Sequence, residues 1–498
     1  MISSIDSFVL HGVDALLCRV EAGVGSDSRP STTVVGLPDT AVRESIERVR
    51  TAMENSGYDF PIGRVVVNLA PADLRKEGPA YDLPIALALL GATGVLTPEG
   101  RRRAARSVMA GELALDGSLR PVRGIIGLGI LARQCRRVVV VPVQDAEEVA
   151  LVEGLEVYGA RTLAEVVHHL NGLQILPAQQ CRRLGLEPSV DVPLERIKGQ
   201  HHAKRALLVA AAGWHNLLLI GPPGCGKTLM ARALPGLLPP LDQESLLEVL
   251  RIHSCAGLLE PDALRTWSRP VRTPHHTASG PAIIGGGSSP HPGEASLAHH
   301  GVLFLDELPE FDRRVLDTLR QPLEEHAVTI ARVGGTVRFP ARFLLVGAAN
   351  PSRRARGSGA FDRRYLDRLS EPFLDRIDMQ IETKPVPLEC LRDEGHSGLT
   401  TSEARDHIVR AKAQQHARQG DVPNGQLSGA ALDEHACMSE STRSLLLESM
   451  ESIGGTARGW DTLRRVARTI ADLDGRREIE AHDITEAVGY RLLNWSGD

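Results

Sequence analysis

The chain has 498 residues, which is too many for one hydrophobic core, so two or three domains are expected. Hydrophobic residues make up 42% and charged residues 24%, as in ordinary soluble globular proteins. The net charge of −5 excludes a polycationic nucleic-acid binder, and any contact with nucleic acid must come from local basic patches.

The seven cysteines form no Cys-x-x-Cys pair. An odd, scattered set argues against a disulfide framework and against a structural zinc site. The first residues, MISSIDSFVLHGVDALL, lack the basic and long apolar regions of a signal peptide, and no uncharged apolar run approaches the length of a membrane span. We therefore expect a reduced, cytoplasmic protein that makes no membrane contact.

Along the chain, residues 1–170 alternate strand-like and helix-like patterns and predict an α/β or α+β domain. The next stretch, rich in Pro, Gly and Gln, predicts a linker. A second α/β pattern follows, and then helical patterns with apolar residues three and four apart. The predicted parts are an N-terminal domain at 1–172, a linker at 173–193, an α/β core at 194–385, a helical connector at 386–428 and a helical lid at 429–498.

The stretch HNLLLIGPPGCGKTLMARAL reads as a buried strand, a glycine-rich turn and a helix. Its centre fits the pattern G-x-x-x-x-G-K-[ST], in which backbone N–H groups close around a phosphate and the helix N-terminus adds positive potential. Lys227 would reach the β- and γ-phosphates, and the Thr228 hydroxyl would bind Mg²⁺. The predicted ATP-binding residues are Gly221, Pro222, Pro223, Gly224, Cys225, Gly226, Lys227 and Thr228.

Two later strands also end in polar residues. GVLFLDELPEF leads to Asp306, which suits binding of Mg²⁺, and to Glu307, which is placed to polarise an attacking water. FLLVGAANP leads to Asn350, whose amide would hold that water against the γ-phosphate. A charged turn and a turn-capping Asn are the plain alternatives, but three strand ends in this order favour a site that hydrolyses ATP.

Arg376 follows a helix-like stretch in LSEPFLDRIDM. An arginine in this place would complete a neighbouring subunit's site and stabilise charge in the transition state. The alternative is that Arg376 simply pairs with Asp375 or Asp378.

Arg458 stands just before a helix in GGTARGWDTLRRVARTIADL. It would contact the γ-phosphate from the lid. Arg464 and Arg465 compete with it for this role.

The order of these motifs resembles the AAA+ ATPases of the magnesium-chelatase-like family, and most closely the ComM/YifB branch, a competence-associated bacterial group. The matching stretches include IKGQHHAKRALLVAAAGWHNLLLIGPPGCGKT, LDTLRQPLEEHAVTIAR and TARGWDTLRRVARTIADL, and the N-terminal GLPDTAVRESIERVRTAMENSG and NLAPADLRKEGPAYDLPIALALL match as well. The resemblance covers nearly the whole chain. It implies an α/β fold with an AAA+ parallel-sheet core, a helix-2 insert, a pre-sensor-1 insert and a helical C-terminal lid.

The resemblance also implies a ring-forming homohexamer that uses ATP and Mg²⁺ to act on DNA. ComM-like proteins are bidirectional helicases that drive branch migration in natural transformation, so single-stranded or branched DNA and recombination proteins are the implied partners. By the same resemblance, Asn350 is sensor 1, Arg376 the arginine finger and Arg458 sensor 2, and residues 194–204 flank the adenine.

The N-terminal domain resembles the proteolytic domain of Lon-type proteases, an S5-type fold. GELALDGSLRPVRGIIGLGILARQCRRVVVVP resembles the segment that carries the Lon catalytic lysine, and EGPAYDLPIA corresponds to the nucleophile segment. Here the serine position holds Ala80 or Tyr81, and residues 121–135 contain no lysine. We expect this fold without a Ser–Lys dyad and without peptidase activity.

Three functions are open on the sequence. The first is an ATP-driven DNA translocase or branch-migration motor. The second is the motor subunit of a metal-chelatase-type or protein-remodelling complex, against which the fused N-terminal domain argues, because chelatase motors are expected to lack it. The third is an ATP-dependent protease or unfoldase, and the missing dyad argues against its protease half. An aromatic content of 3% argues against base stacking as the main grip on DNA.

Residues 272–301 are rich in Gly, Pro and His, and Asp306 comes 79 positions after Lys227, more than one helix and strand require. The histidines form no i, i+4 pair and have no cysteine partner, so a zinc site is not expected. The resemblance makes this stretch the helix-2 insert, followed by a hairpin insert at 326–343. Within it, His275 and His276 are candidate contacts to DNA or a neighbouring subunit, with plain loop structure as the alternative.

After sensor 1 the family commonly has the Cys-rich stretch NPCPCG, whereas this chain reads NPSRRARGSGAFDRRYLDR. Residues 353–376 carry seven arginines against four acids. A phosphate-contacting patch and a solvated or subunit-facing loop are equally good interpretations.

Overall fold

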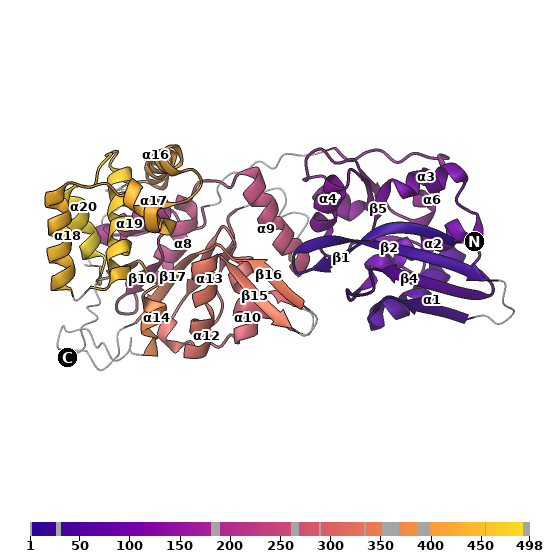
Figure 1. Ribbon diagram of the computed structural model, residues 1–498, viewed down its shortest axis with the longest axis horizontal. Helices are drawn as coiled ribbons and strands as arrows, with labels where there is room; N and C mark the ends of the chain where they lie inside the picture. The colour runs from indigo at the N-terminus through magenta and orange to yellow at the C-terminus, as the bar shows by residue number, and fades with distance from the viewer. Residues whose placement is uncertain are drawn as a thin grey trace. The chain divides into compact units, whose positions relative to one another are not determined.

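The computed structural model describes residues 2–25, 31–180, 190–259, 268–287, 290–332, 335–350, 368–386, 399–453 and 455–491. The chain divides into two compact units (Figure 1). Unit 1 comprises Met1–Gly185 and Asp242–Thr266, and unit 2 comprises Leu186–Leu241 and Trp267–Asp498. Each unit has its own cluster of buried hydrophobic residues. In the described part of the chain, no helix is long and apolar enough to cross a membrane.

Unit 1 is built on a mixed seven-stranded sheet with the order β3-β4-β2-β1-β5-β8-β9. Its strands are β1 Ile2–His11, β2 Asp14–Gly25, β3 Ser31–Val35, β4 Arg64–Ala70, β5 Ser107–Met109, β8 Val138–Pro142 and β9 Val157–Ala160, with a small hairpin of β6 Glu112–Leu113 and β7 Leu119–Arg120. Its helices are α1 Thr40–Asn55, α2 Asp82–Thr93, α3 Pro98–Ala105, α4 Ile125–Gln134, α5 Val143–Val149, α6 Leu163–Asn171 and α9 Gln243–Ala256. Helix α2 is apolar almost all round because it packs against both β1 and β2.

Helix α9 belongs to unit 1, although its sequence lies inside the predicted core at 194–385. It packs against α4, and the Gly124 amide donates to the Ser254 carbonyl at 3.0 Å. Arg251 also donates to Asp14 of β2 at 2.7 Å. An amphipathic pattern shows that a helix buries one face but not which core covers that face, so this placement could not be predicted from the pattern.

Unit 2 contains a five-stranded parallel sheet with the order β11-β14-β17-β10-β18. Its strands are β10 Leu217–Ile220, β11 Val271–Arg272, β14 Val302–Leu305, β17 Leu344–Ala349 and β18 Met379–Glu382. Every residue of β10, β14 and β17 is buried. Helices cover both faces of such a sheet, which is why these strands read as unbroken apolar runs.

The helices of unit 2 fall into those around the sheet and those of the C-terminal part (Figure 1). The first group is α7 His201–Gly213, α8 Lys227–Leu237, α10 Gly280–Ile284, α11 Glu294–Leu297, α12 Arg313–Thr318, α13 Arg320–Glu325 and α14 Glu371–Leu374. The second is α16 Thr401–Gln419, α17 Gly429–His435, α18 Glu440–Ser452, α19 Ala457–Leu473 and α20 Ala481–Gly489. Helices α16, α17 and α20 pack on α19, which has one strongly apolar face, and α18 packs on α20.

The two predicted inserts take different forms. The hairpin expected at 326–343 is confirmed, because β15 Ala327–Arg332 pairs antiparallel with β16 Gly335–Pro340. The His- and Gly-rich stretch at 272–301 is a chain of short elements, in which α10 is followed by the strand pair β12 Gly285–Gly286 and β13 His291–Pro292, and then by α11. Most of the arginine-rich stretch, residues 351–367, lies outside the described residues.

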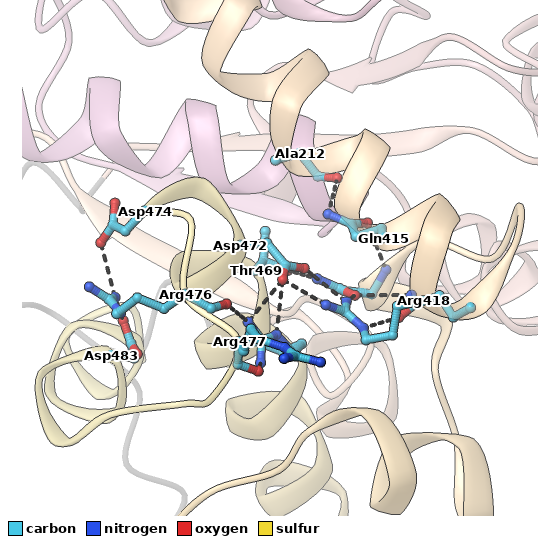
Figure 2. Close-up of polar contacts among 12 residues, drawn as sticks. Ala212, Gln415, Arg418, Thr469, Asp472, Asp474, Arg476, Arg477 and Asp483 are labelled. Atoms are coloured by element: carbon cyan, nitrogen blue, oxygen red, sulfur yellow. Dashed lines mark hydrogen bonds and ion pairs between the residues drawn. The ribbon is translucent and has the colours of Figure 1, made fainter.

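A buried carboxylate, that of Asp472, holds the C-terminal helices together (Figure 2). It accepts hydrogen bonds from Arg418 at 2.7 and 2.9 Å, from Arg468 at 3.1 Å and from Asn424 at 2.8 Å. The side chains of Asp472 and Arg468 are fully buried. One carboxylate thus pairs with two arginines, Arg418 of α16 and Arg468 of α19, so that neither is left without an acid at this buried site.

The same network reaches α7 beside the sheet. Gln415 of α16 donates to the Ala212 carbonyl at 3.2 Å, and the Thr469 hydroxyl of α19 lies 2.7 Å from His215 Nε2 (Figure 2 labels Gln415, Ala212 and Thr469). The C-terminal helices are therefore fixed to the amino-terminal side of β10, which begins two residues after His215.

We expect Asp472→Ala to destabilise unit 2 by about 3 to 5 kcal/mol, because it leaves two arginines at this buried site without their shared acid. Asp461→Ala is the matched control on α19. Its carboxylate is 45% exposed and lies 3.6 Å from Arg464, so its loss should cost about 1 kcal/mol or less. Urea unfolding followed by tryptophan fluorescence measures both. Equal shifts for the two variants would contradict the role given to Asp472.

Candidate nucleotide site

Three adjacent strands of unit 2 end at one edge of the parallel sheet. Ile220 pairs with Ala349, and Leu305 pairs with Gly347, so the carboxyl ends of β10, β17 and β14 meet. The Gly221 amide donates to the Ala349 carbonyl at 3.1 Å. Ligands of open α/β sheets bind beyond these carboxyl ends.

The glycine-rich loop between β10 and α8 contains three glycines with different constraints. Gly224 and Gly226 have φ of 86° and 84°, which favours glycine, and a Cβ at either position would meet no described residue within 4 Å. At Gly221 a Cβ would lie 2.2 Å from the Thr383 carbonyl oxygen. The first two glycines thus give the loop its shape and leave open space beside it, and Gly221 allows β10 and the chain after β18 to approach.

Lys227 is the first residue of α8, and its side chain folds back over the loop. Its Nζ donates to the carbonyls of Gly221 at 2.8 Å and Pro222 at 2.9 Å. Burial lowers the pKa of Lys227, and nearby Cys225 and Asp306 oppose that shift. These two carbonyls are neutral and do not cancel the positive charge of the Lys227 ammonium group. The loop is therefore suited to bind a negatively charged phosphate group.

Thr228 and Asp306 come together as hard oxygen ligands. The Thr228 hydroxyl donates to Asp306 Oδ2 at 3.1 Å, across the gap between α8 and the end of β14. A hydroxyl and a carboxylate beside a phosphate loop fit Mg²⁺, which takes few protein ligands and shares the rest with phosphates. The two side chains that the sequence predicts as metal ligands are therefore adjacent in the fold.

Glu307 adopts an unusual backbone conformation, with φ of 52° and ψ of 43°. Such left-handed geometry is uncommon outside glycine and clusters at functional sites. Its side chain is half exposed, and Oε2 lies 3.7 Å from His276 Nδ1. His276 follows β11, the strand beside β14, so the 272–301 stretch reaches the predicted base. The sequence marked His276 as a candidate but did not indicate this partner.

Asn350 and the segment before α7 complete this edge of the sheet. Asn350 directly follows β17 and is half-buried. Gln200 donates to the carbonyls of Cys225 at 3.3 Å and Lys384 at 2.6 Å, which places the 194–204 segment against the phosphate loop. The sensor and adenine-flanking roles of these residues stay predictions.

Arg376 lies at the opposite edge of the sheet. Its carbonyl accepts from Asn216 Nδ2 at 2.9 Å, just before β10, and β18 begins at Met379, which pairs with Leu217. Asn216 and Gly221 are five residues apart, or about 16 Å along a strand. This exceeds the length of an arginine side chain, so Arg376 cannot reach the phosphate loop of its own chain.

Arg458, at the start of α19, lies beside Arg376. Both guanidinium groups contact Glu324 Oε1, Arg376 at 2.5 Å and Arg458 at 3.0 Å. The acid beside Arg376 is therefore Glu324 of α13, and neither predicted alternative, Asp375 or Asp378, pairs with it among the described contacts. No sequence pattern singled out Glu324.

The competing arginines of α19 have other partners. Arg464 pairs with Asp433 at 2.8 Å and donates to the Leu432 carbonyl at 3.2 Å. Arg465 donates to Thr462 at 2.9 Å and lies 3.8 Å from Asp378. Arg458 is thus the one of these three arginines that joins Arg376.

Comparison with known proteins matches the whole of this architecture. The profile described as magnesium chelatase, subunit ChlI, matches residues 193–391, its C-terminal counterpart matches 398–491, and the profile described as subunit ChlI of Mg-chelatase matches 20–145. Competence protein ComM of Haemophilus influenzae is 41% identical over 97% of this chain and 96% of its own length. YifB of Escherichia coli is 41% identical, with the same coverage of both chains.

The chain belongs to the ComM/YifB family of magnesium-chelatase-like proteins. This confirms the resemblance found in the motifs. A more distant relative is the magnesium-chelatase 38 kDa subunit of Rhodobacter capsulatus, 28% identical over 55% of this chain and 85% of that subunit. Membership of the ComM/YifB family makes unit 2 an AAA+ unit with a parallel sheet and C-terminal helices, and it indicates ATPase activity with ATP and Mg²⁺.

We expect Lys227→Ala to abolish nucleotide binding in this ComM/YifB protein, because it removes the ammonium group over the phosphate loop. Binding of a fluorescent ATP analogue measures the loss. Retained binding at wild-type strength would contradict the site.

We expect Glu307→Gln to bind the nucleotide normally but to hydrolyse it about 100-fold more slowly, because the amide cannot accept a proton from water. Phosphate release measures the rate. Glu310→Gln, three residues on and paired with Arg368 at 3.1 Å, is the control and should hydrolyse normally. Normal turnover by Glu307→Gln would mean that another group is the base.

Proposed function

We propose that the protein is a ring-forming, ATP-hydrolysing motor that acts on DNA, in the manner of a bidirectional branch-migration helicase. The observation that carries the proposal is the position of two groups of residues on opposite edges of one sheet. The phosphate loop and the acids lie at the carboxyl edge, whereas Arg376 and Arg458 lie at the amino edge. A complete site then needs two subunits, and head-to-tail contacts of this kind close into rings.

In this proposal the residues of the carboxyl edge bind the nucleotide and start its hydrolysis. Lys227 and the loop amides bind the β- and γ-phosphates, and Glu307 accepts the proton of a water that Asn350 orients. Thr228 and Asp306 would hold Mg²⁺, which neutralises charge on the phosphates when bound. These roles are supported by sequence position in the fold: Asp306 and Glu307 follow β14, Asn350 follows β17, and Lys227 and Thr228 begin α8 after β10.

Arg376 and Arg458 would serve the site of the neighbouring subunit in a homohexamer. Both arise from elements fixed at the amino edge of β10, Arg376 through Asn216 and α19 through the contact of Thr469 with His215. We therefore assign Arg458 to the neighbour's γ-phosphate, together with the arginine finger. Two guanidinium groups suit the charge that develops during phosphoryl transfer.

Action on DNA is supported by the relative named as a competence protein, which this chain matches along its length. The β15–β16 hairpin and the 272–301 segment are the inserts that we assign to the pore of the ring. Contacts with DNA phosphates would make binding strongly salt-dependent. Recombination proteins and a site of action in the cytoplasm are part of this proposal.

We also propose that unit 1 has a Lon-protease-like fold without peptidase activity. Lys76 is the only lysine of unit 1. It is fully buried and donates to the carbonyls of Leu74, at 2.8 Å, and Pro71. Tyr81, at one of the two positions that correspond to the nucleophile, is also buried. A lysine bound in this way has no route to a substrate as a general base.

The second candidate is the motor subunit of a metal chelatase, favoured by the family profiles. The chelatase subunit of Rhodobacter capsulatus aligns over 85% of its length but only 55% of this chain. Most of the 45% of this chain that lies outside the alignment therefore has no counterpart in the chelatase subunit. For this reason we prefer the DNA motor.

The two candidates differ in what stimulates ATP hydrolysis. We expect the rate to rise severalfold with single-stranded DNA or a four-way junction, to fall back as salt increases, and to remain at the basal level with unfolded protein. A three-strand migration assay should show ATP-dependent movement. Stimulation by protein alone would refute the DNA motor.

Mixing of inactive variants tests the two-subunit site. Lys227→Ala lacks a working phosphate site but keeps both arginines. Arg458→Ala keeps the phosphate site but lacks one of the two arginines. If Arg458 serves the neighbour, rings mixed in equal amounts should regain activity at about one interface in four. At those interfaces the intact phosphate site of an Arg458→Ala subunit faces the intact arginines of a Lys227→Ala subunit. Lys227→Ala mixed with Glu307→Gln is the control, since both changes affect the same half. Equal inactivity of both mixtures would contradict the assignment of Arg458.

A further inference from the structure

One oxygen of Glu324 is shared by two arginines that come from different parts of unit 2. Arg376 precedes β18 of the sheet, and Arg458 begins α19 of the C-terminal helices. Both contact Oε1. The usual strong arrangement between an arginine and a carboxylate is bidentate, with each oxygen engaged. Glu324 therefore satisfies each guanidinium only in part.

The charge at this place is also unbalanced. Arg320, one turn before Glu324 on α13, adds a third guanidinium that acts on Arg376. Burial lowers the pKa of Arg376, Arg458 lowers it further, and Glu324 opposes the shift. The Arg376 side chain is 9% exposed, and its Nε has no hydrogen-bond partner within the part of the chain that the structure describes. In the described part of the chain Glu324 is the one acid paired with Arg376 and Arg458, and with Arg320 nearby this contact has more positive charge and more donors than one carboxylate can match.

A pocket opens next to this cluster. Arg376, Arg458 and Arg465 line it, together with Trp214, Asn216 and two acids, Asp375 and Asp378. The indole Nε1 of Trp214 is a further donor that has no partner among the described residues. Buried donors of this kind are uncommon, and an ordered water or a bound anion can satisfy them.

We propose that Glu324 occupies the place of the γ-phosphate of the neighbouring subunit's nucleotide, and that this phosphate displaces it when the ring is loaded. The proposal rests on the two-subunit site proposed above. Glu324 then acts as an internal competitor that joins Arg376 to Arg458 until a nucleotide arrives next door. The ligand class is a nucleoside triphosphate, recognised through its terminal phosphate.

Exchange of the carboxylate for a phosphate is favourable for two reasons. Glu324 is 45% exposed and stands near the end of a six-residue helix, so its side chain can turn into solvent, and its pair with Arg458, which is 41% exposed, contributes little. A terminal phosphate carries more charge and three oxygens, which can accept from both guanidinium groups at once. The surplus of donors at the cluster matches this larger anion.

Displacement would also change how the sheet and the C-terminal helices are joined. In the structure Glu324 links Arg376 and Arg458 through a residue of the same chain. With a nucleotide present, the link would pass through the neighbour's phosphate. Release of phosphate after hydrolysis would let Glu324 return, so each subunit would detect the state of the next site.

The first test is the ATP dependence of hydrolysis by assembled Glu324→Gln. The amide keeps the shape but competes less, so the ATP concentration at half-maximal rate should fall about fivefold, as expected when an exposed ion pair no longer competes. Glu325→Gln, the next residue on α13, is exposed and bonded to Gln321 at 2.9 Å, and should behave as wild type. A lower maximal rate or a higher half-maximal concentration would mean that Glu324 positions the arginines, and no change would also overturn the proposal.

The second test measures binding at the arginines without hydrolysis. In a Lys227→Ala chain, which has lost its own phosphate site, inorganic tripolyphosphate should bind about fivefold more tightly when Glu324→Gln is added, by calorimetry. Arg376→Ala should remove this binding. Unchanged or weaker binding would overturn the proposal. If tripolyphosphate binds as expected but mixed rings of Lys227→Ala and Arg458→Ala stay inactive, the two-subunit site fails while the competition at Glu324 stands.

Discussion

The direction of five parallel strands determines where everything else in unit 2 lies. Because all five run the same way, their carboxyl ends gather the phosphate loop, Asp306 and Glu307 at one edge, and their amino ends leave Arg376 at the other. Strand β10 connects the two edges, with Asn216 just before it and Gly221 just after it. The distance between the phosphate loop and Arg376 is therefore set by the length of the hydrogen-bonded strands. Side-chain motion cannot change this length.

Buried carboxylates fix the C-terminal helices to the amino edge. Asp378 is buried between the sheet and α19: it accepts from the Asn216 amide at 3.1 Å, faces His215 and lies 3.8 Å from Arg465. His215 continues to Thr469, and Asp472 binds the arginines one turn further along α19. Removing one member of such a network leaves its partners buried and unpaired, which is strongly destabilising. The network therefore holds α19 firmly against the sheet. Arg458 owes its position beside Arg376 to contacts made far along its own helix.

The sequence was sufficient for features that depend on local patterns. The phosphate loop follows from the fixed spacing of its glycines and Lys227, and the β15–β16 hairpin was expected from the resemblance of this stretch to the family. It was insufficient where the partner is distant in the chain. Glu324 lies 52 residues before Arg376 and 134 before Arg458, and His276 meets Glu307 only because β11 lies beside β14. The sequence did not predict that α9 belongs to unit 1, for the same reason. An amphipathic pattern specifies which face of a helix is buried and not which element covers that face.

The course of the chain gives the phosphate loop a short covalent connection to unit 1. Helix α8 begins at Lys227 and ends at Leu237, and α9 begins at Gln243, where the Asp242 side chain caps it through the Ser245 amide at 2.8 Å. A helix moves as a rigid body, so a shift of Lys227 toward a phosphate moves Leu237 as well. Helix α9 is held in unit 1 by Arg251 and the Ser254 carbonyl, so five residues separate the phosphate-binding helix from a fixed point in the other unit. A movement of α8 can therefore be transmitted to unit 1 through these five residues.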